Sequence, residues 1–469
     1  MSTRPTYLSS GEPARLIPVG ADTSKEARAV SIMLAALTSV PPFAKAMLQH
    51  IGQRLGVRAS LECFTEVVFD GNSDKIRPDG LIVVDGGRGR QWHCLVEAKI
   101  GRTEIDADQL TKYLNLARSN NVPALLTISN QFVATPRHSP VRLPKSATKG
   151  VETFHWSWMS VVTEAMLLLN EYDFERPEQR FILNEMVRYF SHRSVAVTTF
   201  DRMNPEWKEL NSKVQSGARL AKTAPEVEDS VAAWHQETRD LCLLLSRKLS
   251  HTVRLRLSRA HREDPTARMR DDCESLVATH RLSCTFDIPD AAAPLVVVAD
   301  LQRRCISVSM TLAAPRDKQR ASSRINWLLR QLTKTDPHGI HVRAYWPGRA
   351  PTTQASLADL RDNASVLESE NRSLVPTSFE VLLVQDLAGK FSGSRTFIEL
   401  LEGAVPTFYE RVGERLRPYI TPPPKLQRQQ AESADDAGAP DGHHDEAVGN
   451  RVAPLPETTP MTTEQPDSS

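Results

Sequence analysis

The feature that most restricts the fold is a series of three strand-like runs between two helical segments near the N-terminus. The runs are mostly apolar, are long enough for a strand, and cover residues 61–69, 79–84 and 93–100. Asp70-Gly71-Asn72 and Gly86-Gly87 separate them and are typical of turns. Residues 24–55 before them and 106–119 after them carry apolar side chains at helical spacing, with a break at Pro41-Pro42. This order predicts a fold in which helices pack on a sheet.

Four further segments extend the pattern to the end of an N-terminal domain. A buried strand is expected at 124–128 and another at 154–158, followed by amphipathic helices over 158–170 and 177–192. The resulting order is helix, three strands, helix, strand, strand and two helices. We therefore assign residues 1–200 to one α/β domain.

The rest of the chain is expected to hold a helical linker, a second domain and a tail. Residues 201–249 have a helical pattern, and residues 250–424 mix strand-like and helical segments, which indicates an α+β domain. Its expected strands are 252–257, 281–288, 295–301, 305–312, 340–346 and 379–385, and its expected helices are 317–333, 356–362 and 396–415. Residues 425–469 lack aromatic side chains and are rich in Pro, Asp, Glu, Ser and Thr, so we expect a disordered acidic tail.

The formal charge of +1 conceals an uneven distribution. The whole chain has 58 basic and 57 acidic residues, but the tail from Lys425 onward has 3 basic and 9 acidic ones. Residues 241–349 contain 19 Lys and Arg against 10 Asp and Glu, a local excess of +9. The net charge of the whole chain argues against a histone-like polycation, whereas the excess of basic residues over 241–349 indicates a partner that carries negative charge.

The densest basic segment is PRDKQRASSRINWLLRQLTK, residues 315–334. On a helix its apolar side chains form one buried stripe, and four basic side chains remain largely outside: Lys318, Arg320, Arg324 and Arg330. Such a face suits a phosphate backbone, so these four residues are candidates for nucleic-acid binding. A solvated helix that faces acidic neighbours is the alternative interpretation. The second domain is also a candidate surface for a homodimer or a protein partner.

Three charged residues in the apolar strand-like runs carry the chemistry. Asp79 begins one run, while Glu97 and Lys99 lie two apart on the next and so point to the same face. If the two strands form a hairpin, Asp79 lies across from that pair. Charged groups in apolar strands cost free energy unless they are paired or bind an ion. Two carboxylates suit Mg²⁺ or Mn²⁺, and the lysine could orient or deprotonate an attacking water or stabilise charge in the transition state.

Pro78-Asp79, then seventeen residues, then Glu97-Ala98-Lys99 resemble the motif of the PD-(D/E)XK nuclease superfamily. Gln109 and Tyr113, on the following helix, are similar to the QxxxY motif of its RecB-type and exonuclease-type members. The resemblance implies a restriction-endonuclease-like αβββαβ core in the N-terminal domain. It also implies that Asp79 and Glu97 bind the divalent metal and that Lys99 assists the attacking water. Gln109 and Tyr113 would help to place the substrate and the lysine.

Several of these residues have a structural interpretation as well. Glu97 and Lys99 could form a surface ion pair on an edge strand, Gln109 could be a surface side chain, and Tyr113 could pack in the core. A further acidic metal ligand varies among members of the superfamily. Glu66 is the candidate for it here, and Glu26 is a weaker one.

The expected function is Mg²⁺-dependent hydrolysis of phosphodiester bonds, with DNA as the expected substrate. The alternative is a catalytically silent nuclease-like module that acts in nucleic-acid binding or protein interaction. The chain has no apolar run of about 18 residues and no apolar N-terminal signal, so we expect a cytoplasmic protein without membrane contact. Its six scattered cysteines include no CxxC pair, which argues against a structural zinc site.

Overall fold

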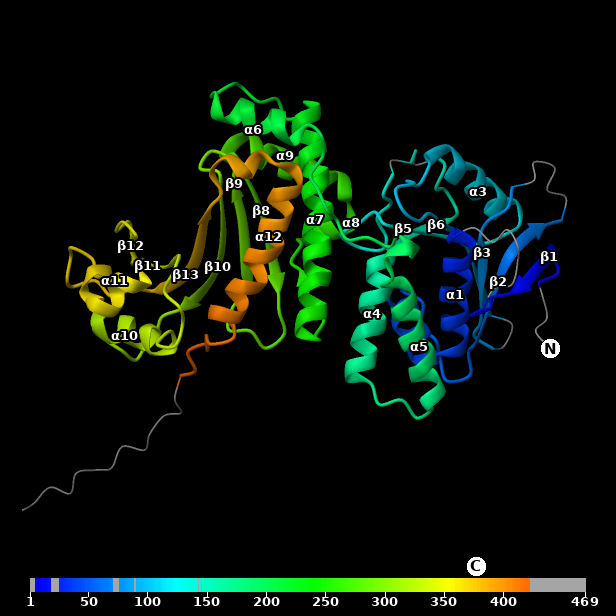
Figure 1. The fold of residues 1–469 in the computed structure, drawn as a ribbon, viewed down its shortest axis with the longest axis horizontal. Helices are drawn as coiled ribbons and strands as arrows, with labels where there is room; N and C mark the ends of the chain where they lie inside the picture. Colours follow the sequence, from blue (N-terminus) through cyan, green and yellow to red (C-terminus); the bar gives the residue numbers. More distant parts are fainter. Residues whose placement is uncertain are drawn as a thin grey trace, which may run out of the picture. The chain divides into compact units, whose positions relative to one another are not determined.

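Two β-sheets, each with its own helices, organise the chain (Figure 1). The computed structural model describes residues 5–17, 25–70, 76–87, 90–141, 143–144 and 146–421. The fold is mixed α/β, as predicted, and the described residues include twelve α-helices. The segment predicted to be a disordered tail, residues 425–469, lies outside the described residues.

The first sheet has six strands in the order β1-β2-β3-β4-β5-β6. They are β1 (Leu8–Pro13), β2 (Ser60–Phe69), β3 (Gly80–Asp85), β4 (Gln91–Ala98), β5 (Ala124–Ser129) and β6 (Glu152–Ser157). The first four are antiparallel neighbours, whereas β4, β5 and β6 run parallel to one another. All but β1 correspond to predicted strands, and the expected hairpin of β3 and β4 is confirmed.

Helices cover both faces of this sheet. They are α1 (Lys25–Ser39), α2 (Pro41–His50), α3 (Ala107–Ser119), α4 (Trp158–Glu171) and α5 (Pro177–Phe190). One face forms a core with α1, α2, α4 and α5, and the other forms a core with α3. The predicted break at Pro41-Pro42 is confirmed, because Pro41 opens α2 directly after α1 has ended. The sheet is therefore the middle layer of three, with α3 on one face and α1, α2, α4 and α5 on the other.

The second sheet has seven antiparallel strands in the order β12-β11-β13-β10-β9-β8-β7. They are β7 (Arg254–Leu255), β8 (Arg281–Asp287), β9 (Leu295–Asp300), β10 (Cys305–Ala313), β11 (Ile340–Tyr345), β12 (Thr353–Ser356) and β13 (Ser378–Asp386). Six of them lie where strands were predicted, and β12 was not predicted. Alternate residues along β8 to β11 are buried, so one face of this sheet carries the core.

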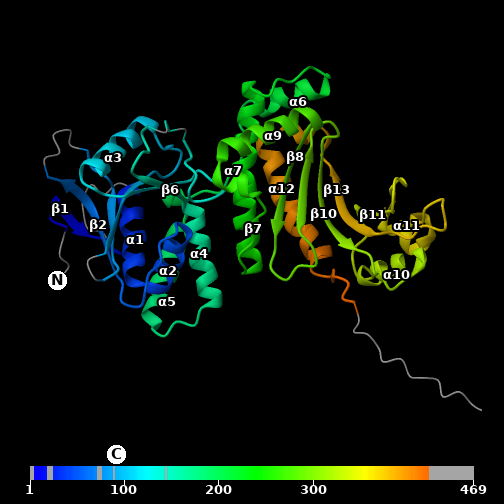
Figure 2. The same cartoon turned by 180° about the vertical axis from the view of Figure 1, so that it is seen from behind.

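Seven helices belong to the part of the chain that follows α5. They are α6 (Trp207–Gln215), α7 (Pro225–Leu249), α8 (Arg259–Glu263), α9 (Pro265–Thr279), α10 (Ala321–Gln331), α11 (Leu357–Asp362) and α12 (Ser394–Phe408). Side chains of α7 and α12 join the core of the second sheet, beside which both helices run (Figures 1 and 2). The helical prediction for 201–249 is confirmed by α6 and α7, whereas α9 was not predicted. Helix α10 begins at Ala321, four residues later than the expected 317.

Among the described residues, no single helix is long and apolar enough to cross a membrane. Only the pair α1 and α2 meets the length and hydropathy requirements together, and it is bent by 110° at the break between its halves.

Candidate active site

Pairing of β3 with β4 places Asp79 beside Glu97. Gly80 lies opposite Val96 in the antiparallel ladder, so Asp79, the residue just before β3, lies next to the end of β4. The Asp79 carboxylate accepts a hydrogen bond from the backbone N–H of Ala98, with Oδ2 2.8 Å from the nitrogen. This bond fixes the carboxylate against the strand that carries the Glu-x-Lys sequence.

Gly80 allows helix α1 to approach this end of the sheet. A Cβ atom at position 80 would lie 2.7 Å from Cδ1 of Leu34 and 3.0 Å from the carbonyl oxygen of Phe64. Both distances are shorter than ordinary van der Waals contact, so a larger residue would force the helix or β2 away. The glycine after Asp79 therefore has a packing role at the start of β3.

Glu97 is the most deeply buried of the charged side chains at this site, with 2% of its surface exposed. Its Oε1 accepts hydrogen bonds from Lys99 Nζ at 2.6 Å and from Gln109 Nε2 at 2.9 Å. Its Oε2 is buried and has no hydrogen-bond partner among the described residues. A buried carboxylate oxygen without a donor is costly, and either a proton shared with the adjacent Asp79 or a bound cation would satisfy it.

Lys99 connects Glu97 to the first helix. Its Nζ lies 3.7 Å from Oε2 of Glu26, and the other oxygen of Glu26 accepts a 3.5 Å hydrogen bond from the N–H of Ile100. The backbone of Lys99 is held as well, because the indole N–H of Trp158 donates to its carbonyl oxygen at 2.8 Å. The lysine is therefore constrained at both its backbone and its ammonium group.

Gln109 and Tyr113 join the same network from α3. Asp106 caps this helix by accepting hydrogen bonds from the N–H groups of Asp108 and Gln109, which sets where the helix begins. One turn apart on the helix, the Gln109 side chain donates to the Tyr113 oxygen at 3.0 Å, and the Tyr113 hydroxyl donates to the carbonyl of Arg77 at 3.2 Å. The structure thus brings both residues to Glu97 and to the segment that leads into Asp79.

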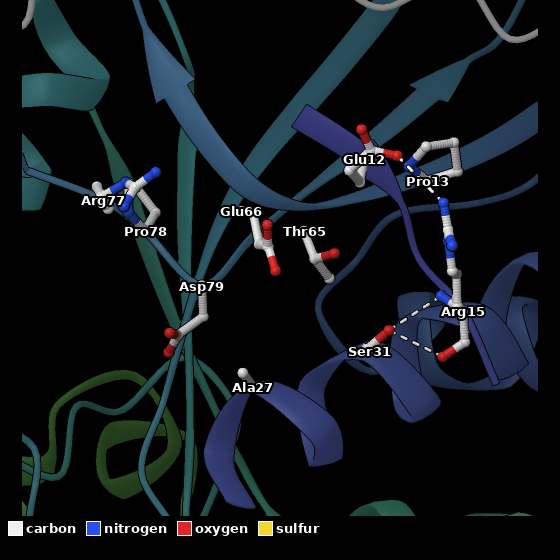
Figure 3. A pocket seen from close by; sticks show the side chains of 10 residues that line it. All are labelled: Glu12, Pro13, Arg15, Ala27, Ser31, Thr65, Glu66, Arg77, Pro78 and Asp79. Carbon is white, nitrogen blue, oxygen red and sulfur yellow. Dashed lines mark hydrogen bonds and ion pairs between the residues drawn. The ribbon is translucent and has the colours of Figure 1, made fainter. Parts of the chain in front are cut away.

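Glu66 reaches the site region by a different route. It is an exposed residue of β2 with a φ of 52°, where the pairing of β1 with β2 changes register. Such a bulge turns a side chain out of the regular alternation of the strand. Glu66 and Asp79 both line a cleft of about 480 Å³ (Figure 3). Within the described residues Glu66 makes none of the hydrogen bonds that join the other predicted residues.

Burial and mutual repulsion change how the two carboxylates titrate. Burial, followed by the charge of Glu97, raises the pKa of Asp79 from its ordinary 3.8 to about 7. Burial also raises the pKa of Glu97, although the Lys99 ammonium opposes the rise. For Lys99, burial lowers the pKa, but the hydrogen bond and charge of Glu97 outweigh burial and the pKa is raised. At neutral pH the lysine is therefore charged, while the carboxylate pair would gain from a nearby cation.

The donor set suits a hard divalent cation that takes most of its ligands from elsewhere. Asp79 and Glu97 supply carboxylate oxygens, and one of these is the buried Oε2 that has no donor. In the part of the chain that the structure describes, no group of three or more His, Cys, Asp or Glu side chains has the arrangement of a complete metal site. Mg²⁺ is commonly held by one or two carboxylates together with water and substrate phosphate, so the pair fits such an ion.

The four basic residues predicted to bind nucleic acid occupy different environments. Arg320 and Arg330 are exposed, and neither guanidinium has a partner within the described residues. Lys318 precedes α10 and lies 3.8 Å from Asp317. The Arg324 guanidinium is half-buried and donates to the carbonyls of Lys318 at 2.7 Å and Pro376 at 2.8 Å. Arg324 thus ties a loop to its own helix, and of these four residues Arg320 and Arg330 are the two whose guanidinium groups have no partner in the described parts of the chain.

No protein-family model matches the chain, and no curated protein or solved structure matches it either. The chemistry assigned to the site therefore depends on the side-chain geometry described above.

Proposed function

We propose that the chain is a metal-dependent nuclease that hydrolyses phosphodiester bonds, with DNA as its substrate. The observation that carries the proposal is the convergence on Glu97. This buried carboxylate binds Lys99 and Gln109 through one oxygen, leaves the other without a donor, and lies beside Asp79. An unsatisfied carboxylate oxygen next to a second carboxylate and an ammonium group is an arrangement that suits the binding of a cation.

The element order supports the proposed restriction-endonuclease-like αβββαβ core. Helix α1 is followed by the antiparallel strands β2, β3 and β4, then by α3 and by β5, which is parallel to β4. Asp79 immediately precedes β3 and Glu97 lies on β4, the two central strands of this unit, and Gln109 lies on its second helix. The order agrees with the core implied by the sequence motif, and it is part of the proposal.

In the proposed reaction Asp79 and Glu97 would hold Mg²⁺ or Mn²⁺, with the exposed Glu66 as a candidate for a further ligand. The ion would polarise the phosphate and lower the pKa of the attacking water. Lys99 acts as a fixed positive charge, because its pKa is raised and its ammonium is anchored to Glu97. It therefore stabilises negative charge that develops on the phosphate and orients the water through N–H donation.

Gln109 and Tyr113 act as positioning residues. Gln109 holds the oxygen of Glu97 that also binds Lys99, so it fixes the orientation of the carboxylate. Tyr113 holds the carbonyl of Arg77, two residues before Asp79. Loss of either contact would loosen the carboxylate pair without removing a charge from the site.

Cleavage of linear and circular DNA in Mg²⁺ tests the proposal. Asp79→Asn and Lys99→Met should each lower the cleavage rate by at least about 100-fold, since each removes electrostatic stabilisation of the transition state. Asp108→Asn and Lys112→Met are matched controls, because both residues are exposed on α3, and these variants should cleave at the wild-type rate. Cleavage that survives both site substitutions would contradict the proposal, and DNA binding without any cleavage or Mn²⁺ binding would favour a silent nuclease-like module.

Arg320 and Arg330 are proposed as additional contacts for nucleic acid. Both are exposed and unpaired within the described residues, so each can bind a phosphate without breaking an existing contact. Arg320→Gln with Arg330→Gln should weaken DNA binding and reduce its dependence on salt. Unchanged binding would remove α10 from the path of the substrate.

A further inference from the structure

Two arginines stand at opposite ends of the cleft, with carboxylates between them. Arg77 lies at one end beyond Asp79, Arg15 lies at the other end, and Glu66 and Asp79 lie between them (Figure 3). The cleft is about 480 Å³ in volume and is built from β1, the bulge of β2, the start of β3 and helix α1. Glu12 also lines the cleft and pairs with Arg15 at its end. Guanidinium groups at the two ends with Glu66 and Asp79 between them suit a chain of phosphates with one cation at its centre.

Arg77 has a fixed backbone and an unoccupied guanidinium. Its carbonyl oxygen accepts the 3.2 Å hydrogen bond from Tyr113, and the next two residues lead directly to Asp79. Its side chain is exposed and has no ion pair or hydrogen bond within the described residues. The backbone of Arg77 is therefore held beside the segment that leads into Asp79, while the five N–H donors of its side chain remain available.

Arg15 is anchored from the opposite wall. The hydroxyl of Ser31, on α1, accepts a hydrogen bond from the Arg15 N–H at 2.9 Å and donates to the Arg15 carbonyl at 2.8 Å. Ser31 is buried, with 4% of its surface exposed. Among the residues that the structure describes, the Arg15 guanidinium has one partner, Glu12, in an exposed ion pair at 3.3 Å. An exposed pair of this kind contributes at most about 1 kcal/mol, so a phosphate can replace it.

We propose that Arg77 and Arg15 bind backbone phosphates on the two sides of the phosphate that is cleaved, so that one strand of nucleic acid crosses the cleft past Asp79. This inference rests on the proposed nuclease function, which supplies the identity of the polyanion. A guanidinium presents a planar fork of donors that matches two phosphate oxygens, and contacts of this kind position a strand without reading its sequence. The arginines therefore determine where the strand lies, while Asp79 and Glu97 determine where it is cut.

Binding of a single-stranded oligonucleotide to the full chain with Asp79→Asn, in the absence of divalent metal, tests the inference separately from cleavage. The Asp79→Asn substitution removes one of the carboxylates that repel phosphate, and hydrolysis contributes nothing to the measurement. In this background Arg77→Gln and Arg15→Gln should each weaken binding about tenfold at low salt. Each should also reduce the slope of log K against log salt concentration by about 0.7, the value for one phosphate contact with a single strand.

Two further variants control the experiment. Arg188→Gln removes an exposed arginine of α5 that pairs with Glu185 at 3.4 Å and lies outside the cleft, and it should change neither affinity nor slope. Arg77→Lys keeps the charge and loses the planar fork, so it should keep the slope and lose part of the affinity. Equal melting temperatures of all variants will show that they are folded.

The inference is overturned if both glutamine variants keep the parental slope, or if the parent binds no oligonucleotide at low salt. The two proposals can fail independently. Wild-type cleavage together with unchanged slopes would refute the role of the arginines and leave the nuclease proposal intact. Reduced slopes together with absent wild-type cleavage would refute the nuclease proposal and leave a strand-binding cleft.

Discussion

Replacing Asp79 with asparagine should stabilise the folded protein at neutral and alkaline pH, although it removes a proposed catalytic charge. Asp79 lies in a largely buried position beside Glu97, and its carboxylate accepts a hydrogen bond from the Ala98 N–H at 2.8 Å. The amide oxygen of asparagine can accept the same hydrogen bond. The substitution therefore removes the charge and preserves the contact.

The size of the effect follows from the pKa of Asp79, which burial and the Glu97 charge raise from 3.8 to about 7. At about 1.4 kcal/mol per pH unit, this rise corresponds to about 4 kcal/mol of free energy. The folded state binds the proton more tightly than the unfolded chain, so the cost of ionising Asp79 is absent below about pH 4 and complete above about pH 7. Asp79→Asn should therefore equal the wild type in stability near pH 4 and exceed it by up to about 4 kcal/mol at pH 8.

Urea unfolding followed by tryptophan fluorescence, at pH 5, 6, 7 and 8 in a chelator, measures this difference. Asp108→Asn is the matched control, because Asp108 is exposed and its substitution should give a small difference that does not change with pH. A stability difference for Asp79→Asn that is independent of pH would show that the pKa of Asp79 is not raised in the folded protein. So would a variant that is less stable than the wild type at pH 8.

Three further substitutions test other parts of the structure. Gly80→Ala should lower the free energy of unfolding by about 1–3 kcal/mol, because the added Cβ would overlap α1 and β2. Gly56→Ala is the control, since nothing lies near a Cβ at that position, and it should be tolerated. Equal melting temperatures of the two variants would count against the close approach of α1 and β2 to Gly80. Arg324→Ala should lower the free energy of unfolding, measured in urea, by about 1–3 kcal/mol, because two carbonyls lose their donor. Arg330→Ala should leave this free energy unchanged. A larger loss for Arg330→Ala than for Arg324→Ala would be inconsistent with the hydrogen bonds of Arg324. Glu237 is fully buried, burial raises the pKa of its carboxyl well above the usual range, and its oxygens have no partner among the described residues. Glu237→Gln should therefore raise the melting temperature by an amount that grows as the pH rises above about 5, and a constant difference would argue against ionisation of Glu237 on unfolding.

Local patterns in the sequence were sufficient to predict most elements near the site. Apolar runs bounded by turn residues predicted β2, β3 and β4, and Pro41 predicted the end of α1, because these signals act over a few residues. Strand β1 was missed because its sequence, LSSGEP, is polar and contains glycine and proline; it forms by pairing with the edge of β2. Helix α9 was missed because its charged residues conceal a short buried stripe.

The contacts that complete the site were beyond the reach of sequence spacing. Spacing placed Glu97 and Lys99 on one face, but nothing in it indicated that the Trp158 indole would hold the Lys99 carbonyl from 59 residues away. The bulge that turns Glu66 into the cleft also depends on how β1 pairs with β2. Arg324 was expected on an outer face because helical periodicity does not reveal the carbonyl of Pro376 from a distant loop.

Anomalous scattering from crystals grown with Mn²⁺ tests whether Asp79 and Glu97 bind a metal ion together. We expect one anomalous peak between the two carboxylates, within reach of the oxygen of Glu97 that has no donor within the described residues. The peak should be absent from crystals of Asp79→Asn grown under the same conditions. Crystals without a peak at this position, at a Mn²⁺ concentration that saturates any activity, would contradict the assignment of these carboxylates as metal ligands.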